Sequence, residues 1–356
     1  MMKCCIFTLI GGNDNYGAEL QNYAVQQILK KIGCYSETFF SQTRGEKRIA
    51  VIKILLYDYL KKGMGKSYGK YYKRRRKFEY FRKNYINISQ YNKYVLNNIN
   101  SLYDYFVVGS DQVWNPLYNS FSNTMMLTFA DNNKKIAFCA SVGIDEIPEE
   151  KEEIFKKNLP LFNAISVREK QAEKLLQQYC RKKIVTLCDP TLMLRKKEWE
   201  KIAVKPYAQM PSKYILSYFL GKMSEEKKNQ IEFLMKTHGY TLIDVSPYLS
   251  SRVNKEDSSY YDIGPLEFIW LVFNAEIVCT DSFHGFAFSC IGERKVRVFQ
   301  REDTLNMEGR IIGLANELGY NLKYGKEFCV DSRVLADFCK TKIDAAENFL
   351  RQSMRK

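Results

Sequence analysis

Histidine is scarce in this sequence, and its ten cysteines include no C-x-x-C pair. His238 and His284 are the only histidines. Zinc and iron–sulfur sites need clustered cysteine and histidine ligands, so we expect no metal site. Six of the cysteines lie in apolar segments: Cys4, Cys5, Cys139, Cys188, Cys279 and Cys290. This placement is typical of reduced, buried thiols rather than of disulfides.

Long hydrophobic runs are also lacking. No segment approaches the roughly 20 apolar residues that a membrane-spanning helix needs. The apolar run Cys4–Ile10 is short for a signal peptide, follows a single lysine and leads directly into a glycine turn. It is better explained as a buried first strand, and we expect the protein to remain in the cytoplasm.

The 356 residues exceed the size at which a single hydrophobic core usually keeps growing, which predicts two domains. Short apolar runs, typical of strands buried on both faces, alternate with amphipathic helical segments, which predicts an α/β protein with parallel sheets. Nine strands are expected: Cys4–Ile10, Tyr105–Gly109, Lys135–Ser141, Ala164–Val167, Ile184–Leu187, Tyr214–Tyr218, Thr241–Val245, Ala275–Thr280 and Val296–Phe299.

The domain boundary is expected near residues 180–190, where Asp189-Pro190 marks a turn. We predict an N-terminal domain at 1–183, a C-terminal domain at 184–331 and a terminal helix at 332–356. Two such domains would face each other across a cleft. Ligands of open α/β sheets bind beyond the carboxyl ends of the strands, so the residues after each strand are the candidates for a site.

Positive charge is concentrated within a basic helical insertion at about 45–100. The formal net charge is +15, and Lys61–Lys83 contains eleven Lys or Arg against one Glu. Such a segment attracts polyanions, including an anionic membrane surface or a diphosphate-linked substrate. A solvated helical face with Phe78, Tyr80 and Phe81 partly packed explains the pattern equally well. No nucleic-acid-binding motif accompanies the charge, so we do not expect a nucleic-acid partner.

Two polar segments follow predicted strands of the N-terminal domain. Gly11–Gly17 leads into a helix whose free amides suit an anion or a sugar, with Asn15 and Tyr16 as candidate contacts, although ligand-free turn glycines explain it as well. The second segment carries Asp111, Gln112 and Trp114, a mixture suited to sugar hydroxyls and to the C–H face of a sugar ring. Asp111 could also accept a proton from a hydroxyl. An Asx-type turn with Trp114 in the core is the equal alternative.

Three further candidates follow later strands. Arg168 stands between a strand and a helix, where it could hold a carboxylate or phosphate, although a surface ion pair explains it as well. The segment after Thr280 runs through Ser282, His284 and Gly285 into a helix of small residues. Phosphate would suit the first amides of that helix, and an imidazole there could donate a hydrogen bond or a proton. Arg310 could add positive charge to the same pocket.

Taken together, these segments resemble the polysaccharide pyruvyl transferase family. The resemblance covers roughly residues 5–322 in the family's order. Its motifs are NYGAELQNYAVQQIL, VVGSDQVWNP, ISVRE, LCDPTLML, and TDSFHGFAFSCIGERKVRVF followed by Asn306 and RIIGLANELGY. The basic stretch is not one of the family's signatures.

The resemblance implies two Rossmann-like domains arranged as in glycosyltransferases of the B type. It also implies phosphoenolpyruvate as co-substrate, no cofactor, and a pair of sugar hydroxyls as acceptor, giving a cyclic pyruvate ketal on a surface polysaccharide or its lipid-linked precursor. By similarity, His284 and Arg168 belong to the donor site, with Asp111, Asp281 and Arg310 as weaker assignments. His284 could act as proton donor or as phosphate ligand. The alternative is a glycosyltransferase of the same fold that uses a nucleotide-sugar.

Overall fold

The N-terminal domain is a parallel six-stranded sheet flanked by helices. The computed structural model describes residues 1–11, 14–40, 66–89, 98–254, 259–301 and 308–355. The sheet has the order β2-β1-β3-β4-β5-β6. Its strands are β1 (Met2–Phe7), β2 (Cys34–Thr38), β3 (Tyr105–Val108), β4 (Lys135–Ala140), β5 (Ala164–Val167) and β6 (Ile184–Thr186). The helices of this domain are α1 (Tyr16–Lys31), α4 (Glu149–Asn158) and α5 (Lys170–Gln177).

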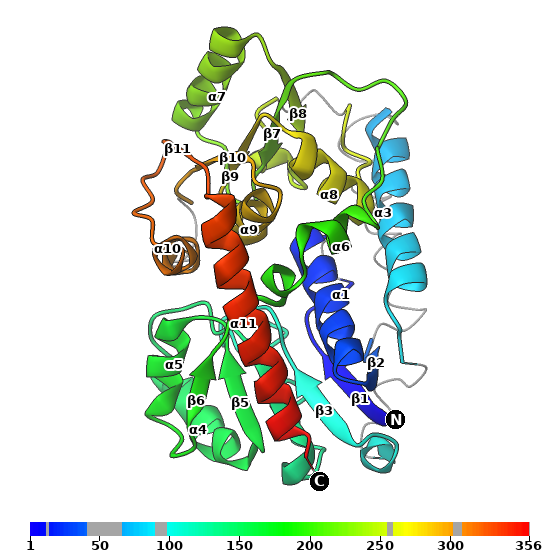
Figure 1. Ribbon diagram of the computed structural model, residues 1–356, viewed down its shortest axis with the longest axis vertical. Helices are drawn as coiled ribbons and strands as arrows, with labels where there is room; N and C mark the ends of the chain where they lie inside the picture. The colour runs from blue at the N-terminus through cyan, green and yellow to red at the C-terminus, as the bar shows by residue number, and fades with distance from the viewer. Residues whose placement is uncertain (12–13, 41–65, 90–97, 255–258, 302–307, 356) are drawn as a thin grey trace.

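The C-terminal domain repeats this architecture with five strands in the order β11-β10-β9-β7-β8. Its strands are β7 (Tyr214–Tyr218), β8 (Thr241–Asp244), β9 (Ile277–Thr280), β10 (Lys295–Val298) and β11 (Glu327–Phe328), the last antiparallel to β10. Its helices are α7 (Glu225–His238), α8 (Pro265–Asn274), α9 (Phe283–Ile291) and α10 (Glu308–Glu317). The two domains lie one above the other in Figure 1.

The central strands form because their sequences are apolar along their whole length. Every residue of β3, β4, β7 and β9 is buried, as expected for parallel strands covered by helices on both faces. The edge strand β2 alternates buried and partly or fully exposed residues, since only one of its faces meets the core. Residues that follow β1, β3, β9 and β10 line one cavity, so the carboxyl ends of strands from both sheets meet between the domains.

The boundary between the domains lies later than the predicted 183/184. β6 pairs with β5 in the N-terminal sheet, so that domain extends at least to Thr186. A connector with a short 3₁₀ turn (Pro190–Met193) and α6 (Lys196–Glu200) then leads to β7. The N-terminal sheet thus ends within the predicted region 180–190, and only the exact division at 183/184 is displaced, because β6 belongs to the first sheet.

The terminal helix α11 (Ser332–Ser353) runs from the C-terminal domain back along the N-terminal domain, as Figure 1 shows. Ser353 accepts a hydrogen bond from Asn163 at 2.7 Å through its backbone oxygen, and the ring of Phe349 stacks on Phe138. The helix therefore ties the two domains together.

The domains also share a hydrophobic core. Tyr16, at the start of α1, stacks on Phe268 of α8 at 4.3 Å between ring centroids and meets Tyr218 edge-on. Trp199 of α6 packs edge-on against Phe288 of α9. These contacts belong to one continuous cluster of buried residues from both domains. The base of the cleft is thus filled by packed apolar side chains.

The basic stretch forms helix α3 (Lys66–Tyr85), which stands beside α8 in Figure 1. Phe78 and Phe81 are fully buried, whereas Tyr80 is 56% exposed, so the expected packing is found for the two phenylalanines. Arg74 is buried as well, donating to the hydroxyl of Tyr16 and to the carbonyl of Asp14. The parts of the insertion at 45–65 and 90–97 lie outside the described residues.

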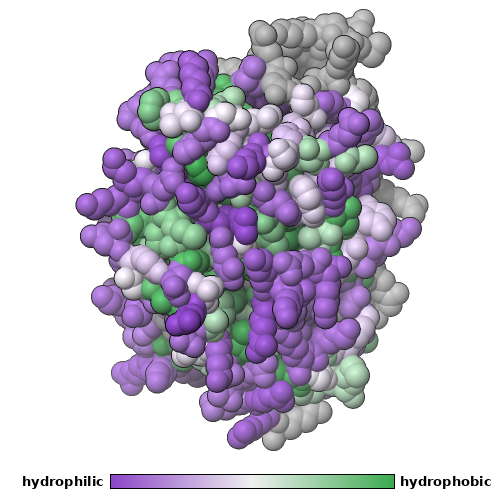
Figure 2. Space-filling view, turned by 45° about the horizontal axis from the view of Figure 1, so that its top comes forward, coloured by the Kyte–Doolittle hydropathy of each residue, from purple (hydrophilic) through white to green (hydrophobic). Residues whose placement is uncertain are grey.

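The face shown in Figure 2 is mainly hydrophilic, with hydrophobic residues showing in patches between polar ones. Among the described helices, none is long and apolar enough to cross a membrane.

Candidate functional site

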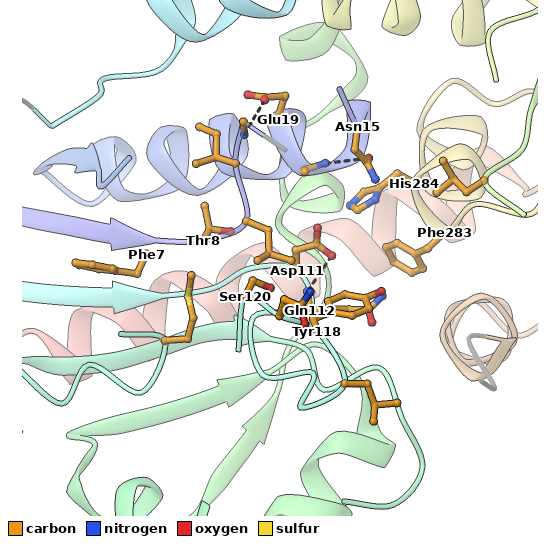
Figure 3. Close-up of a pocket in the computed structure, with 18 of the residues that line it drawn as sticks. Phe7, Thr8, Asn15, Glu19, Asp111, Gln112, Tyr118, Ser120, Phe283 and His284 are labelled. Atoms are coloured by element: carbon orange, nitrogen blue, oxygen red, sulfur yellow. Dashed lines mark hydrogen bonds between the residues drawn. The ribbon is translucent and has the colours of Figure 1, made fainter. Parts of the chain in front are cut away.

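A cavity of about 1010 Å³ lies between the two domains. It is formed by the end of β1, the start of α1, the loop after β3, the start of α9 and two arginines that follow β10. Figure 3 shows His284 and Asp111 approaching the same space from opposite domains. Six of the predicted site residues line it: Asn15, Asp111, Gln112, Ser282, His284 and Arg310.

The loop after β3 supplies Asp111 and Gln112 but not Trp114. Asp111 has a left-handed backbone (φ 70°), which costs about 1 kcal/mol or more for a residue other than glycine. Its carboxylate accepts the amide of Gln112 at 2.9 Å. The assignment of Trp114 to the acceptor site is wrong, because its side chain is fully buried, packs on Phe162 and donates to the carbonyl of Met125.

The start of α1 supplies Asn15 but not Tyr16. The side chain of Asn15 caps the helix by accepting the amides of Gly17 and Ala18, which leaves its amide nitrogen for other contacts. Tyr16 is fully buried in the interdomain core, so its assignment to the acceptor site is also wrong. Its hydroxyl donates to the carbonyl of Ile263 and anchors the two domains instead.

The start of α9 is capped by its own residue Ser282. The hydroxyl of Ser282 accepts the amide of Gly285 at 3.4 Å, so the amide expected to hold phosphate already has a partner. A Cβ atom at Gly285 would lie 2.3 Å from Oγ1 of Thr280. Gly285 does not line the cavity, and its role is this close approach between helix and strand rather than contact with a donor.

His284 lies at the boundary of the cavity rather than inside a domain. The residue is 6% exposed, and its Nε2 is buried without a hydrogen bond. Oδ2 of Asp189 lies 3.6 Å from that nitrogen. Gly17 packs closely against the ring beside Nδ1, where an added Cβ would stand 2.0 Å from that nitrogen. Three separate parts of the chain therefore position the imidazole.

Asp189 is the common partner of His284 and Arg168. Its fully buried carboxylate accepts Nη1 of Arg168 at 2.6 Å and both the amide and the hydroxyl of Thr191. Burial alone would raise the pKa of the Asp189 carboxyl, but His284, Arg168 and Thr191 together hold that pKa well below its usual range. Asp189 therefore stays a carboxylate at every physiological pH.

Arg168 is buried behind the cavity rather than exposed in it. Besides Asp189, its guanidinium donates to Glu169 at 3.0 Å and lies 3.8 Å from Asp111. It lines a second cavity of about 630 Å³ between α5, α10 and α11 and stacks 4.8 Å from the Phe283 ring. The alternative prediction, an ion pair of Arg168 at the surface, is therefore wrong, because Arg168 pairs with Asp189 and Glu169 in the interior. Direct contact of Arg168 with a donor stays a prediction.

Two other arginines do line the main cavity. Arg301 donates to the backbone oxygen and the carboxylate of Asp281, at 3.2 and 3.4 Å. When the side-chain amide of Gln112 is oriented so that both its oxygen and its nitrogen have hydrogen-bond partners, the oxygen accepts from Arg310 at 2.9 and 3.0 Å. Burial, with a further contribution from Arg168, lowers the pKa of Arg310 to about 10, so it remains charged at neutral pH.

Sequence reasoning missed Asp189, Gly17 and Glu19. Asp189 was taken only as a turn residue before a proline, although it follows β6, where site residues were sought. Gly17 carries no functional group, and only the fold shows that it faces His284. Glu19 lines the main cavity and is 2% exposed, with Arg82 donating to it at 2.7 Å.

Known proteins share this fold at low sequence identity. The structure resembles UDP-N-acetylglucosamine 2-epimerase from Rickettsia bellii, with TM-score 0.50, 9% identity and coverage of 99% of this chain and 97% of that chain. S. aureus MnaA in a co-structure with UDP gives TM-score 0.50 and 11% identity, over 98% and 91%. A putative UDP-N-acetylglucosamine 2-epimerase from Listeria monocytogenes gives TM-score 0.50 and 13% identity, with coverage of 99% of this chain and 89% of that chain.

These likenesses confirm the predicted fold class, two Rossmann-like domains arranged as in glycosyltransferases of the B type. No curated protein matches the sequence. The sequence profile of one family does match, under the description polysaccharide pyruvyl transferase, and it covers residues 15–302. The matched range contains the start of α1, the loop after β3, Asp189 and His284, so this chain belongs to the polysaccharide pyruvyl transferase family.

Proposed function

We propose that this protein transfers the pyruvyl group of phosphoenolpyruvate to two hydroxyls of a glycan, forming a cyclic ketal. Membership of the family supports a transferase of this kind. The structural support is the division of the cavity into two chemically different sides. The C-terminal side presents His284, Arg301 and Arg310, and the N-terminal side presents Asp111 and several hydroxyl and amide groups.

The cationic side suits the donor. Phosphoenolpyruvate carries a carboxylate and a phosphate, and guanidinium groups bind both with paired hydrogen bonds. Arg301 is fixed by Asp281, whose carboxylate is itself held by the amides of Leu220 and Gly221 at 2.8 Å. Fixed cations of this kind need little reorganisation when charge develops on the leaving phosphate.

The N-terminal side suits a sugar acceptor. Hydroxyl and amide groups that could bond sugar hydroxyls converge there: Asn15, Gln112, Tyr118, Asn119, Ser120, Ser122 and Thr124. Asp111 adds a carboxylate to them, and Figure 3 shows it facing the imidazole of His284. The cavity volume of about 1010 Å³ is at the upper end of the usual range for ligand sites, as a donor and a sugar together require.

The reaction then proceeds by one addition and one displacement at C2 of phosphoenolpyruvate. His284 donates a proton to C3, which makes C2 electrophilic, and the first sugar hydroxyl adds there while Asp111 takes its proton. The second hydroxyl forms the other C2–O bond, the C2–O bond to phosphate breaks, and its proton leaves with the phosphate. One hydroxyl proton thus offsets the proton given to C3, and the products are a ketal and inorganic phosphate.

Phosphate release from phosphoenolpyruvate, measured with a panel of hexose and N-acetylhexosamine glycosides, tests this proposal. General acid–base help contributes about 10²- to 10⁴-fold, so His284→Asn should lower turnover by at least 10²-fold with little change in melting temperature. His238→Asn is the matched control, because it replaces the only other histidine, at the end of α7. A His284→Asn variant with more than a tenth of the wild-type rate would contradict the role.

The competing function is transfer of a sugar from a nucleotide-sugar. Its support is that the R. bellii, S. aureus and L. monocytogenes proteins carry UDP or UDP-sugar in their names. Parallel incubations with labelled phosphoenolpyruvate and with labelled UDP-sugars separate the two functions. Label transferred only from the UDP-sugar would reject pyruvyl transfer.

We also propose that the protein acts in the cytoplasm and that the outer face of α3 contacts an anionic membrane when the acceptor is lipid-linked. Lys73, Arg76 and Lys83 are exposed there, together with Tyr72 and Tyr80. Cations combined with tyrosines are typical of surfaces that bind lipid headgroups. Arg74 takes no part, because it is buried against Tyr16 and would disturb the fold if neutralised.

A further inference from the structure

The two nitrogens of His284 have different surroundings. Nε2 is buried, makes no hydrogen bond to the protein, and lies 3.6 Å from Oδ2 of Asp189. Nδ1 lies close to the backbone of Gly17, and unlike Nε2 it is not among the buried nitrogens of the described residues that lack a hydrogen bond. The side chain of His284 is 8% exposed, and since Nε2 is inaccessible, this exposure belongs to the rest of the ring.

Asp189 is a fixed, charged partner for this ring. Its Oδ1 is held by Thr191 at 2.6 and 2.9 Å, and its Oδ2 by Arg168 at 2.6 Å, so the carboxylate has no freedom to turn away. A carboxylate accepts hydrogen bonds but donates none. A neutral imidazole facing it is therefore stable only with the proton on Nε2, because two lone pairs would otherwise oppose each other.

We infer that Asp189 is a positioning residue that holds His284 in the Nε2–H tautomer, which makes Nδ1 the nitrogen that exchanges a proton with the substrate. The inference deepens the proposed function and rests on it for the identity of the substrate. In the forward reaction the Nδ1–H bond of the imidazolium breaks as the C3–H bond of phosphoenolpyruvate forms, and the electron pair stays on Nδ1. Asp189 remains ionised throughout and stabilises the imidazolium that precedes this step.

The same carboxylate links the imidazole to Arg168. Arg168 donates to Asp189 and to Glu169 and approaches Asp111 at 3.8 Å, so the network reaches from His284 to the N-terminal side of the cavity. Loss of Asp189 should therefore release both the imidazole and the guanidinium. A test of the tautomer separates these two effects, because it observes the ring nitrogens directly.

Nitrogen-15 NMR of protein labelled only at histidine measures the tautomer. The chain has two histidines, so the spectrum contains two rings, and the His284→Asn variant assigns them. A pH series that reaches the neutral form should show His284 as Nε2–H in the wild-type protein. An Nδ1–H tautomer in the wild-type protein would overturn the inference without any variant.

Two variants test the role of Asp189. Asp189→Asn should abolish the preference for Nε2–H, because the amide can offer either an acceptor or a donor to the ring. Thr191→Val is the matched control, because it removes one bond to Asp189 but keeps the charge beside His284, so the tautomer should be retained. An unchanged tautomer in Asp189→Asn, with the wild-type unfolding temperature, would also overturn the inference.

Kinetics give the second readout. Asp189→Asn should lower turnover at least about 10-fold in the wild-type background and less than about 3-fold in the His284→Asn background, because residues that act as one unit are not additive. Equal losses in both backgrounds would show a role that bypasses the ring. If phosphoenolpyruvate proves not to be a substrate, the proposed function fails while the NMR result still decides the tautomer.

Discussion

Replacing Gly17 by alanine tests whether the position of the His284 ring controls activity. Gly17 lies in the first turn of α1, and its backbone is compatible with any residue, since its φ is not positive. An ideal Cβ there would lie 2.0 Å from Nδ1, 2.4 Å from Cγ and 2.7 Å from Cε1 of His284. The new methyl group therefore meets one specific ring and leaves the polar groups of the site unchanged.

The ring has to move a long way to accept this methyl group. Ordinary contact begins at 3.4 Å, so Nδ1 must retreat by about 1.4 Å, although the ring is already enclosed on its Nε2 side by the buried carboxylate of Asp189. A misplacement of about 1 Å in a reacting group can cost about 10²-fold in rate. We expect Gly17→Ala to lower kcat/KM for phosphoenolpyruvate by about 10²-fold or more.

The fold should survive this change. Alanine is favoured over glycine in a helix by up to about 1 kcal/mol, which partly offsets the cost of moving the ring. Gly69→Ala in α3 is the matched control, because no atom lies within 4 Å of its ideal Cβ. Phosphate release and thermal unfolding are measured for both variants. If Gly17→Ala keeps more than half of the wild-type kcat/KM, the close packing of the ring does not control catalysis.

Two further predictions concern buried and surface charge. Burial raises the pKa of Glu19 from 4.5 to about 7. Between these two pH values the folded state binds a proton that the unfolded state has lost. The free energy of unfolding therefore falls by up to about 3 kcal/mol as the pH rises from about 4.5 to about 7. The increase in melting temperature that Glu19→Gln gives over the wild type should therefore be larger at pH 8 than at pH 5. The same difference between the two proteins at both pH values would contradict this. Neutralising Lys73 and Arg76 with glutamine should lower sedimentation with anionic vesicles while sparing activity on a soluble acceptor. Unchanged sedimentation would reject membrane contact by this face of α3.

The sequence predicted the central strands well because burial on both faces demands apolar residues throughout. Tyr105–Val108 and Tyr214–Tyr218 were located almost to the residue. The prediction missed β2, Cys34–Thr38, because this edge strand includes polar residues such as Ser36 and Glu37 and so lacks a continuous apolar run. It also missed β11, whose two residues give no periodic signal at all.

Most of the polar candidates line the cavity, with Arg168 behind it, whereas the two aromatic candidates do not line it. Asp111 and His284 follow buried strands, and the topology brings them to one cavity as expected. Tyr16 and Trp114 stand in equally polar segments, yet both rings are fully buried. An aromatic residue that stacks on a sugar and one that fills a core have the same sequence context, and only the tertiary packing separates them.

The position of His284 also depends on how the domains meet. Its ring is set by Gly17 from the N-terminal domain, Asp189 from the connector and the start of α9 from the C-terminal domain. One residue before Gly17, Tyr16 stacks on Phe268 within the shared core. Rotating the domains apart would expose this apolar surface and withdraw Gly17 from the imidazole. Because one interface both joins the domains and aligns the ring, a change that loosens it should lower activity before it unfolds either domain.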